Sequence, residues 1–276
     1  METRFTNSPK ETSGMNTAEL RSNFLVENLM VDNSIRLTYS HYDRMIIGGV
    51  KPVTEHVSLP NHHELRAEYF LERREMGIIN VGGDGVVVAD GEEFPLRKLD
   101  GLYLGKGTKN VSFRSVNTNA PALFYILSVP AHNSFPNKSL AKEETNPVTL
   151  GDAVTANRRT IYKYIHLDGL KSCQLVMGLT VLDAGSVWNT MPAHTHTRRM
   201  EVYFYFDVPD ENRVVHFMGE PTETRHLFIA NHEAVISPPW SIHAGCGTTN
   251  YGFIWGMAGE NLVYSDMDPA PVTSLR

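Results

Sequence analysis

The sequence predicts an all-β protein with two antiparallel β-barrels in one chain and a few short helices. Many short runs of β-branched and aromatic residues follow one another, separated by Gly, Pro, Asp and Asn. Asp-Gly pairs at 84–85, 90–91 and 100–101 mark tight turns between such runs. The chain has 276 residues, which is enough for one large all-β domain or two domains of ordinary size. Short strands at regular spacing are typical of antiparallel barrels and sandwiches.

The beginning of the chain differs from the rest. Residues 1–18 are polar, and we expect them to be loosely ordered unless they dock on another part of the protein. Residues 18–29 (AELRSNFLVENL) carry leucine and valine at helical spacing, which predicts one short helix.

Strands are predicted along the remainder of both halves. In the first half they are RLTYS (36–40), RMIIGGV (44–50), EYFLER (68–73), GIINV (77–81), GVVVAD (85–90) and GLYL (101–104). In the second half they are SCQLVMGLTVL (172–182), EVYFYFDV (201–208), RVVHFM (213–218), HLFI (226–229), AVIS (234–237) and YGFIWGM (251–257).

The polar segment 132–160 is the best candidate for a linker, and it separates a first barrel in residues 1–150 from a second in residues 151–276. ERREMGIINV (72–81) can be laid over TRRMEVYFYF (197–206), which suggests a duplicated barrel. Under that alignment Glu68 and Phe70, or near neighbours, replace the two histidines described below, so the first barrel is expected to lack metal ligands.

Composition and charge narrow the possible partners. Hydrophobic residues make up 41% of the chain, charged residues 20%, and the formal net charge is −6 without a basic run. Nucleic acid is therefore not expected as a partner. Neither an apolar run of about 18 residues nor a secretory signal is present, so no membrane association is expected. Two isolated cysteines, Cys173 and Cys246, suit a reducing cytoplasm.

The stretch MPAHTHTRRMEVYFYF (191–206) is the first candidate functional motif. On a strand, His194 and His196 point to the same side, although such a pair also arises by chance. Glu201 follows five residues later and would face the opposite side of a straight strand. A shared metal site therefore requires a turn or bulge within 197–200. Glu201, Tyr203 and Tyr205 would then point inward, and the intervening residues would point outward: Val202, Phe204 and Phe206.

A fourth candidate ligand, His243, lies about forty residues further on, in SPPWSIHAG (237–245). The combined pattern HxHxxxxE and PxWxxH resembles the paired motifs of the cupin superfamily, in which three histidines and a glutamate bind a metal ion inside a barrel. It predicts a site formed by His194, His196, Glu201 and His243. Such a set leaves coordination positions open, as catalytic metals need. The donor types fit Zn, Fe(II), Mn and Ni alike.

A closer resemblance covers nearly the whole chain. The sequence is similar to the 5-keto-4-deoxyuronate isomerase family, also called 4-deoxy-L-threo-5-hexosulose-uronate ketol-isomerases, in phrases that include YSHYDRMIIGG (39–49), YFLERREMGIINVGG (69–83), WNTMPAHTH (188–196) and FIWGMAGEN (253–261). The resemblance implies two cupin-like barrels (a bicupin), a homohexamer, and one zinc ion per subunit bound by the same four residues.

The reaction that the resemblance implies converts 5-dehydro-4-deoxy-D-glucuronate to 3-deoxy-D-glycero-2,5-hexodiulosonate during pectin and uronate catabolism. A proton must leave C2, an enediol(ate) must be stabilised, and a proton must be added at C1. The candidates for the base remain open: a hydroxide on the metal, Glu201, Tyr203 or Tyr205. The substrate carboxylate favours an arginine partner, and the candidates are Arg158, Arg159, Arg198, Arg199 and Arg225.

Two other functions remain as alternatives. The first is an Fe(II)-dependent cupin dioxygenase that acts on a small organic acid, and the second is a non-catalytic sugar-acid binding protein. Cupin-like barrels serve many functions, so the fold does not distinguish among them. Oxygen uptake identifies the first alternative, and binding without turnover identifies the second.

Overall fold

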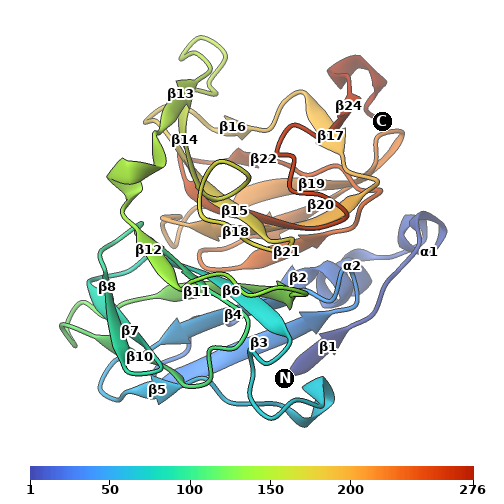
Figure 1. The fold of residues 1–276 in the computed structure, drawn as a ribbon. Helices are drawn as coiled ribbons and strands as arrows, with labels where there is room; N and C mark the ends of the chain where they lie inside the picture. The colour runs from blue at the N-terminus through green and yellow to red at the C-terminus, as the bar shows by residue number, and fades with distance from the viewer.

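Two similar halves, each made of two facing β-sheets, form the protein (Figure 1). The computed structural model describes residues 1–276. Almost all regular structure is β-strand, which confirms the predicted all-β fold class. The sheets are not closed, because each has two edge strands, so each predicted barrel is an open pair of sheets.

The first half contains a seven-stranded and a four-stranded sheet. The larger sheet has the order β1 (Glu2–Arg4), β3 (Ser34–Ser40), β4 (Ile46–Lys51), β11 (Phe124–Pro130), β6 (Arg74–Asn80), β9 (Gly101–Leu104) and β12 (Lys138–Leu140). The smaller has the order β5 (Val57–Ser58), β10 (Val111–Ser115), β7 (Gly85–Ala89) and β8 (Glu92–Leu96).

The second half repeats this plan. Its larger sheet has the order β13 (Val148–Leu150), β14 (Arg159–Ile165), β15 (Val176–Leu182), β23 (Gly252–Gly259), β18 (Arg199–Phe206), β21 (Ala234–Ser237) and β2 (Leu25–Val26). Its smaller sheet has the order β16 (Trp188–Asn189), β22 (Ala244–Gly247), β19 (Val214–Glu220) and β20 (Glu223–Ile229). A two-stranded sheet pairs β17 (Ala193–Thr195) with β24 (Asp268–Ala270).

The strand orders of the two large sheets correspond. The run β3-β4-β11-β6-β9 matches β14-β15-β23-β18-β21, which places β6 where the alignment of 72–81 with 197–206 predicts it. This topology supports a duplication. The division at residues 150 and 151 stays a prediction, and β2 belongs by pairing to the sheet of the second half.

The two α-helices are short, and both lie near the N-terminus. A capping box of Asn16 and Glu19 starts α2 (Thr17–Phe24), and Leu25 and Val26 then pair with β21, so the helix ends earlier than predicted. Residues 1–18 are better ordered than expected, because β1 pairs with β3 and α1 (Pro9–Ser13) lies beside the second half in Figure 1. The 3₁₀ turns are η1 (His63–Leu65), η2 (Lys142–Thr145) and η3 (Val272–Ser274).

Two other predictions differ from the structure. Residues 68–73 form turns, and β6 begins only at Arg74, because Glu72 bonds back to the N–H of Glu68 and to the carbonyl of Tyr69. The predicted linker 132–160 is partly regular and contains β12, η2 and β13.

The two large sheets pack against each other to join the halves. A continuous core of buried side chains runs from the first half through this interface into the second. Tyr125 on β11 stacks on Phe204 of β18, with 4.2 Å between ring centroids. The sheets approach so closely at Gly77 that an added Cβ would lie 2.6 Å from the sulfur of Met177. No helix is long and apolar enough to cross a membrane.

Candidate metal centre

The four predicted ligands come from adjoining segments of the second half. His194 lies on β17, His196 directly after it, Glu201 on β18, and His243 directly before β22. The predicted break within 197–200 is a turn, closed by a 3.0 Å hydrogen bond from the N–H of Arg199 to the carbonyl of His196. This turn separates β17 from β18 and lets Glu201 face the same space as the histidines.

The side chains of β18 alternate as predicted. Glu201 and Tyr203 line a cavity, and the Tyr205 hydroxyl bonds to His216 at 2.7 Å on the facing sheet. Phe204 points the other way and stacks on Tyr125 of the first half. On a straight strand Glu201 would face away from the two histidines, and the turn brings it to the same side.

The ligand atoms of the four residues lie within 4.8 Å of one another. Nε2 of His194 is 3.1 Å from Nε2 of His196 and 3.0 Å from that of His243. Oε2 of Glu201 is 3.0 Å from Nε2 of His196 and 2.8 Å from that of His243. Donors at right angles around an ion with bonds of about 2.1 Å are about 3.0 Å apart, so this group could hold a divalent metal ion.

Burial and the neighbouring groups together set the charge of the cluster. Burial alone raises the pKa of Glu201, but the close imidazoles of His243 and His196 outweigh this effect. The pKa of this carboxyl therefore lies well below its usual value. Burial lowers the pKa of His194 to about 3, so its ring is neutral at physiological pH. A carboxylate and a neutral imidazole are the forms that bind a metal ion.

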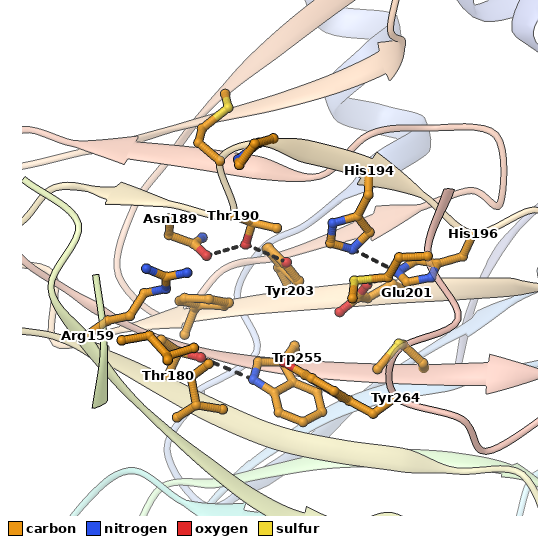
Figure 2. A pocket seen from close by; sticks show the side chains of 17 residues that line it. Arg159, Thr180, Asn189, Thr190, His194, His196, Glu201, Tyr203, Trp255 and Tyr264 are labelled. Atoms are coloured by element: carbon orange, nitrogen blue, oxygen red, sulfur yellow. Dashed lines mark hydrogen bonds and ion pairs between the residues drawn. The ribbon is translucent and has the colours of Figure 1, made fainter. Parts of the chain in front are cut away.

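Three of the four residues line a cavity of about 320 Å³ (Figure 2). One side of it is polar, because Tyr203 bonds at 3.1 Å to the hydroxyl of Thr190, which in turn bonds to Asn189. Much of the remaining wall is apolar or aromatic and includes Ile161, Phe253, Trp255, Met257 and Tyr264. The volume is at the lower end of those that bind small molecules.

The structure separates the five candidate substrate-binding arginines, and Arg158 pairs with Asp183 away from the cavity. Arg159 lines the cavity, and Figure 2 shows it at the opposite end from His194 and His196. Arg198 pairs with Asp266 and Asp268, and Arg199 is fully buried and bonds to the carbonyls of Val263 and Asp266. Arg225 pairs with Glu223 on β20. These three do not line the cavity.

Several lining residues were not predicted. Asn189 and Thr190 stand just before the histidine pair in the sequence, and their small polar side chains gave no separate signal. Tyr264 and Met267 come from the loop before β24, which the pairing of β24 with β17 helps to bring back to the cavity. Contacts between segments so far apart in the sequence produce no local pattern from which they could be predicted.

Comparison with known proteins then assigns the chain to a family. The profile of the KduI/IolB family matches residues 25–271. The chain belongs to the KduI/IolB family. A 4-deoxy-L-threo-5-hexosulose-uronate ketol-isomerase of Enterococcus faecalis is 52% identical over 276 residues, which are all of both chains. One from Formosa agariphila is 54% identical over all of this chain and 98% of that protein. The resemblance drawn from the sequence phrases is thus confirmed.

Solved structures agree with membership of the KduI/IolB family. An IolB-like protein from Salmonella typhimurium aligns with a TM-score of 0.72 and 16% identity, over 88% of this chain and 95% of that one. An oxalate decarboxylase from Lactobacillus farciminis aligns with a TM-score of 0.58 and 11% identity, over 85% of this chain and 83% of that one. At such identities these structures support the two-part fold alone.

Proposed function

We propose that the chain is a metal-dependent ketol-isomerase that converts 5-dehydro-4-deoxy-D-glucuronate to 3-deoxy-D-glycero-2,5-hexodiulosonate. The observation that carries the proposal is the identity of 52% over the full length with a protein named for this activity. The cavity adds a physical reason, because it joins a cluster of metal donors to a single arginine across a space of small-molecule size.

The proposed cofactor is one zinc ion per chain, held by His194, His196, Glu201 and His243. When bound, a divalent cation supplies Lewis-acid chemistry, in which it polarises the carbonyl at C1 and stabilises negative charge on the substrate oxygens. Fe, Mn and Ni remain possible occupants of the same donors.

The residues of the chain supply proton transfer and orientation. Glu201 faces the cavity beside the metal donors, and it is our candidate for the base that takes the proton from C2. Tyr203 also faces the cavity. Burial and the nearby Glu201 raise the pKa of Tyr203 well above its ordinary value, so its hydroxyl keeps its proton and can donate a hydrogen bond to a substrate oxygen.

We assign the substrate carboxylate to Arg159. Its guanidinium donates to the carbonyl of Asn157 at 2.9 Å and pairs with no carboxylate of the chain. The open-chain acid would then lie along the cavity, with its carboxylate at Arg159 and its carbonyl end at the metal donors. Arginine binds a carboxylate with two parallel hydrogen bonds, which fixes the direction of the substrate.

The wider assignments belong to the same proposal. We expect a cytoplasmic homohexamer that acts in pectin and uronate catabolism and binds neither nucleic acid nor membranes. The second half, residues 151–276, is expected to carry the activity, with the first half as a support that lacks metal ligands.

The test supplies the purified protein with 5-dehydro-4-deoxy-D-glucuronate and follows the product by NMR while an electrode records oxygen. We expect the ketose product to form without oxygen uptake, and to stop forming in the protein stripped by a chelator. Oxygen consumption would favour the dioxygenase. Saturable binding without product in the zinc-loaded protein would favour the binding protein.

A further inference from the structure

The C-terminal strap, residues 260–270, lies against the candidate ligands. Its β24 pairs with β17, and this pairing places Pro269 opposite His194. Its Tyr264 and Met267 form part of the cavity wall. The strap therefore contacts both the histidine pair and the space where a substrate would lie, although it is almost seventy residues away in sequence.

One strap atom bonds directly to a candidate ligand. The carbonyl oxygen of Asp266 is 2.8 Å from Nδ1 of His196. Nη2 of Arg199 also lies 3.2 Å from Nδ1, but it donates to the same carbonyl at 2.8 Å. The carbonyl of Asp266 is the closer partner of Nδ1 and can only accept, so Nδ1 carries the hydrogen and Nε2 is left to face His194 and Glu201. A metal-binding histidine is commonly oriented in this way, by a hydrogen bond from its second ring nitrogen to a carbonyl.

Arg198 holds Asp266 in place. Its Nε donates to both carboxylate oxygens of Asp266, at 2.8 and 2.9 Å, and its Nη2 reaches Asp268 at 3.0 Å. These hydrogen bonds, with one from Asn261, hold the pKa of Asp266 well below its usual value. A backbone hydrogen bond also joins the strap to this arginine, because the N–H of Glu260 donates to the carbonyl of Arg198 at 3.0 Å.

Arg199 supports the strap from inside the protein. The guanidinium is fully buried and donates to the carbonyl of Val263 at 2.9 Å and to that of Asp266 at 2.8 Å. The two adjacent arginines after His196 thus both hold the strap, Arg198 through carboxylates and Arg199 through carbonyls. Their contacts explain why neither lines the cavity.

We propose that Asp266, anchored by Arg198, is a positioning residue that fixes the ring of His196, so that the C-terminal strap sets the affinity of the metal centre. The inference rests on the proposed metal site and deepens it. It gives Arg198 a role in metal binding in place of one in substrate binding.

The test measures zinc affinity in stripped protein by competition with a chromophoric chelator, so it does not depend on activity. We expect Arg198→Met and Asp266→Ala each to weaken zinc binding about 10- to 100-fold, the range found when such supporting residues are lost. Arg114→Met is the matched control, since Arg114 pairs with Glu93 at 3.0 Å on the first half and is similarly exposed. The control is expected to bind zinc like the wild type.

Two further variants keep the test decisive. Asp266→Asn preserves the shape of the side chain and is expected to give an intermediate loss of zinc affinity. It replaces Asp266→Ala in the test if that variant does not fold. The double variant of Arg198→Met and Asp266→Ala is expected to bind zinc about as well as Asp266→Ala alone, because the two residues act as one unit.

The outcomes separate this inference from the proposed function. A wild type that binds no zinc would remove the proposed site itself. A wild type that binds zinc, with folded variants within about two-fold of it, would overturn only the role of the strap. If the fold-losses of zinc affinity in the two single variants multiplied in the double variant, the two residues would act independently, and the anchoring of Asp266 by Arg198 would be overturned.

Discussion

Arg159 is the residue best placed to select an acidic substrate, because it is the arginine that lines the cavity. We expect Arg159→Met to raise KM and leave kcat nearly unchanged, since the carboxylate is bound equally in ground and transition states. Loss of a charged hydrogen bond worth about 1.5–3 kcal/mol corresponds to about a 10- to 150-fold change in kcat/KM.

The neighbouring residue provides the control for this kinetic measurement. Arg158 pairs with Asp183 at 3.2 Å on the surface, and Arg158→Met is expected to leave KM unchanged. An equal KM in Arg159→Met and wild type would remove Arg159 from the carboxylate site and leave the isomerase proposal standing.

The buried side chain of His216 makes the stability of the protein depend on pH. Its ring is fully buried beside the Tyr205 hydroxyl, and burial lowers the pKa of His216 to about 3. Below pH about 6.5 the unfolded chain takes up a proton at this residue and the folded chain does not, so the stability falls as pH decreases toward 3. This one group costs about 1 kcal/mol between pH 6 and pH 5.

Urea unfolding of the stripped protein at these two pH values checks the expectation. The variant His216→Gln should lose about 1 kcal/mol less stability over this interval than the wild type. A variant at His63, whose side chain is 85% exposed, should follow the wild type, because solvent surrounds its ring in both states. Identical losses in His216→Gln and wild type would contradict the argument.

The sequence carried the four candidate ligands but not the partners that hold them. His194, His196, Glu201 and His243 stand out because their residue types and spacing form a pattern. The roles of Arg198 and Arg199 could not be predicted, since their partners are acids and carbonyls more than sixty residues away. Such contacts depend on the tertiary fold alone.

At the scale of elements, two equivalent hairpin loops fasten the halves to each other. The loop between β14 and β15 gives the N–H groups of Cys173, Gln174 and Leu175 to the buried carboxylate of Glu75 on β6, at 2.7–3.0 Å. The loop between β3 and β4 places Asp43 so that it accepts the N–H of Met200 on β18, at 3.0 Å. In the first contact, a loop of the second half binds a side chain at the start of β6. In the second, a loop of the first half binds a backbone N–H at the start of β18.

Removal of the Glu75 carboxylate should weaken this junction strongly. Glu75→Ala leaves three backbone N–H groups and the hydroxyl of Tyr103 without their acceptor in a buried position. At 1–3 kcal/mol for each unsatisfied group, we expect a loss of at least about 3 kcal/mol in the free energy of unfolding, measured in urea. Glu93→Ala, at an exposed ion pair, is expected to stay within about 0.5 kcal/mol. A similar small loss at Glu75 would show that the loop is not held there.

Strands in runs of β-branched and apolar residues were mostly predicted, although the seven-residue strands β11 and β14 were missed together with the shortest ones. AVIS coincides with β21, and RVVHFM lies almost entirely within β19, because each has enough β-branched and apolar residues to form a pattern. Strand β2 has two residues and continues directly from α2, so its helix-like sequence concealed it. The segment 68–73 has strand-forming residues, but local hydrogen bonds fold it into turns.

At the scale of the whole molecule, the two halves share one topology and differ at the site. In the strand alignment, Met76 on β6 takes the position of Glu201 on β18, so the first half lacks the carboxylate at this point. The all-β class and the twofold repetition followed from strand spacing and from a ten-residue alignment. The pairing of β2 with the sheet of the second half could not be predicted, because contacts between short strands far apart in the sequence produce no local pattern.

The central claim is that isomerisation depends on one metal ion held by the four-residue cluster. The most direct measurement adds Zn²⁺ in steps to stripped protein and records the rate of ketose formation against zinc bound. The proposal predicts a rate that rises in proportion to bound zinc and levels off at one equivalent per chain, with no rise in a His194→Ala variant. Full activity in the stripped protein, with no dependence on added metal, would contradict it.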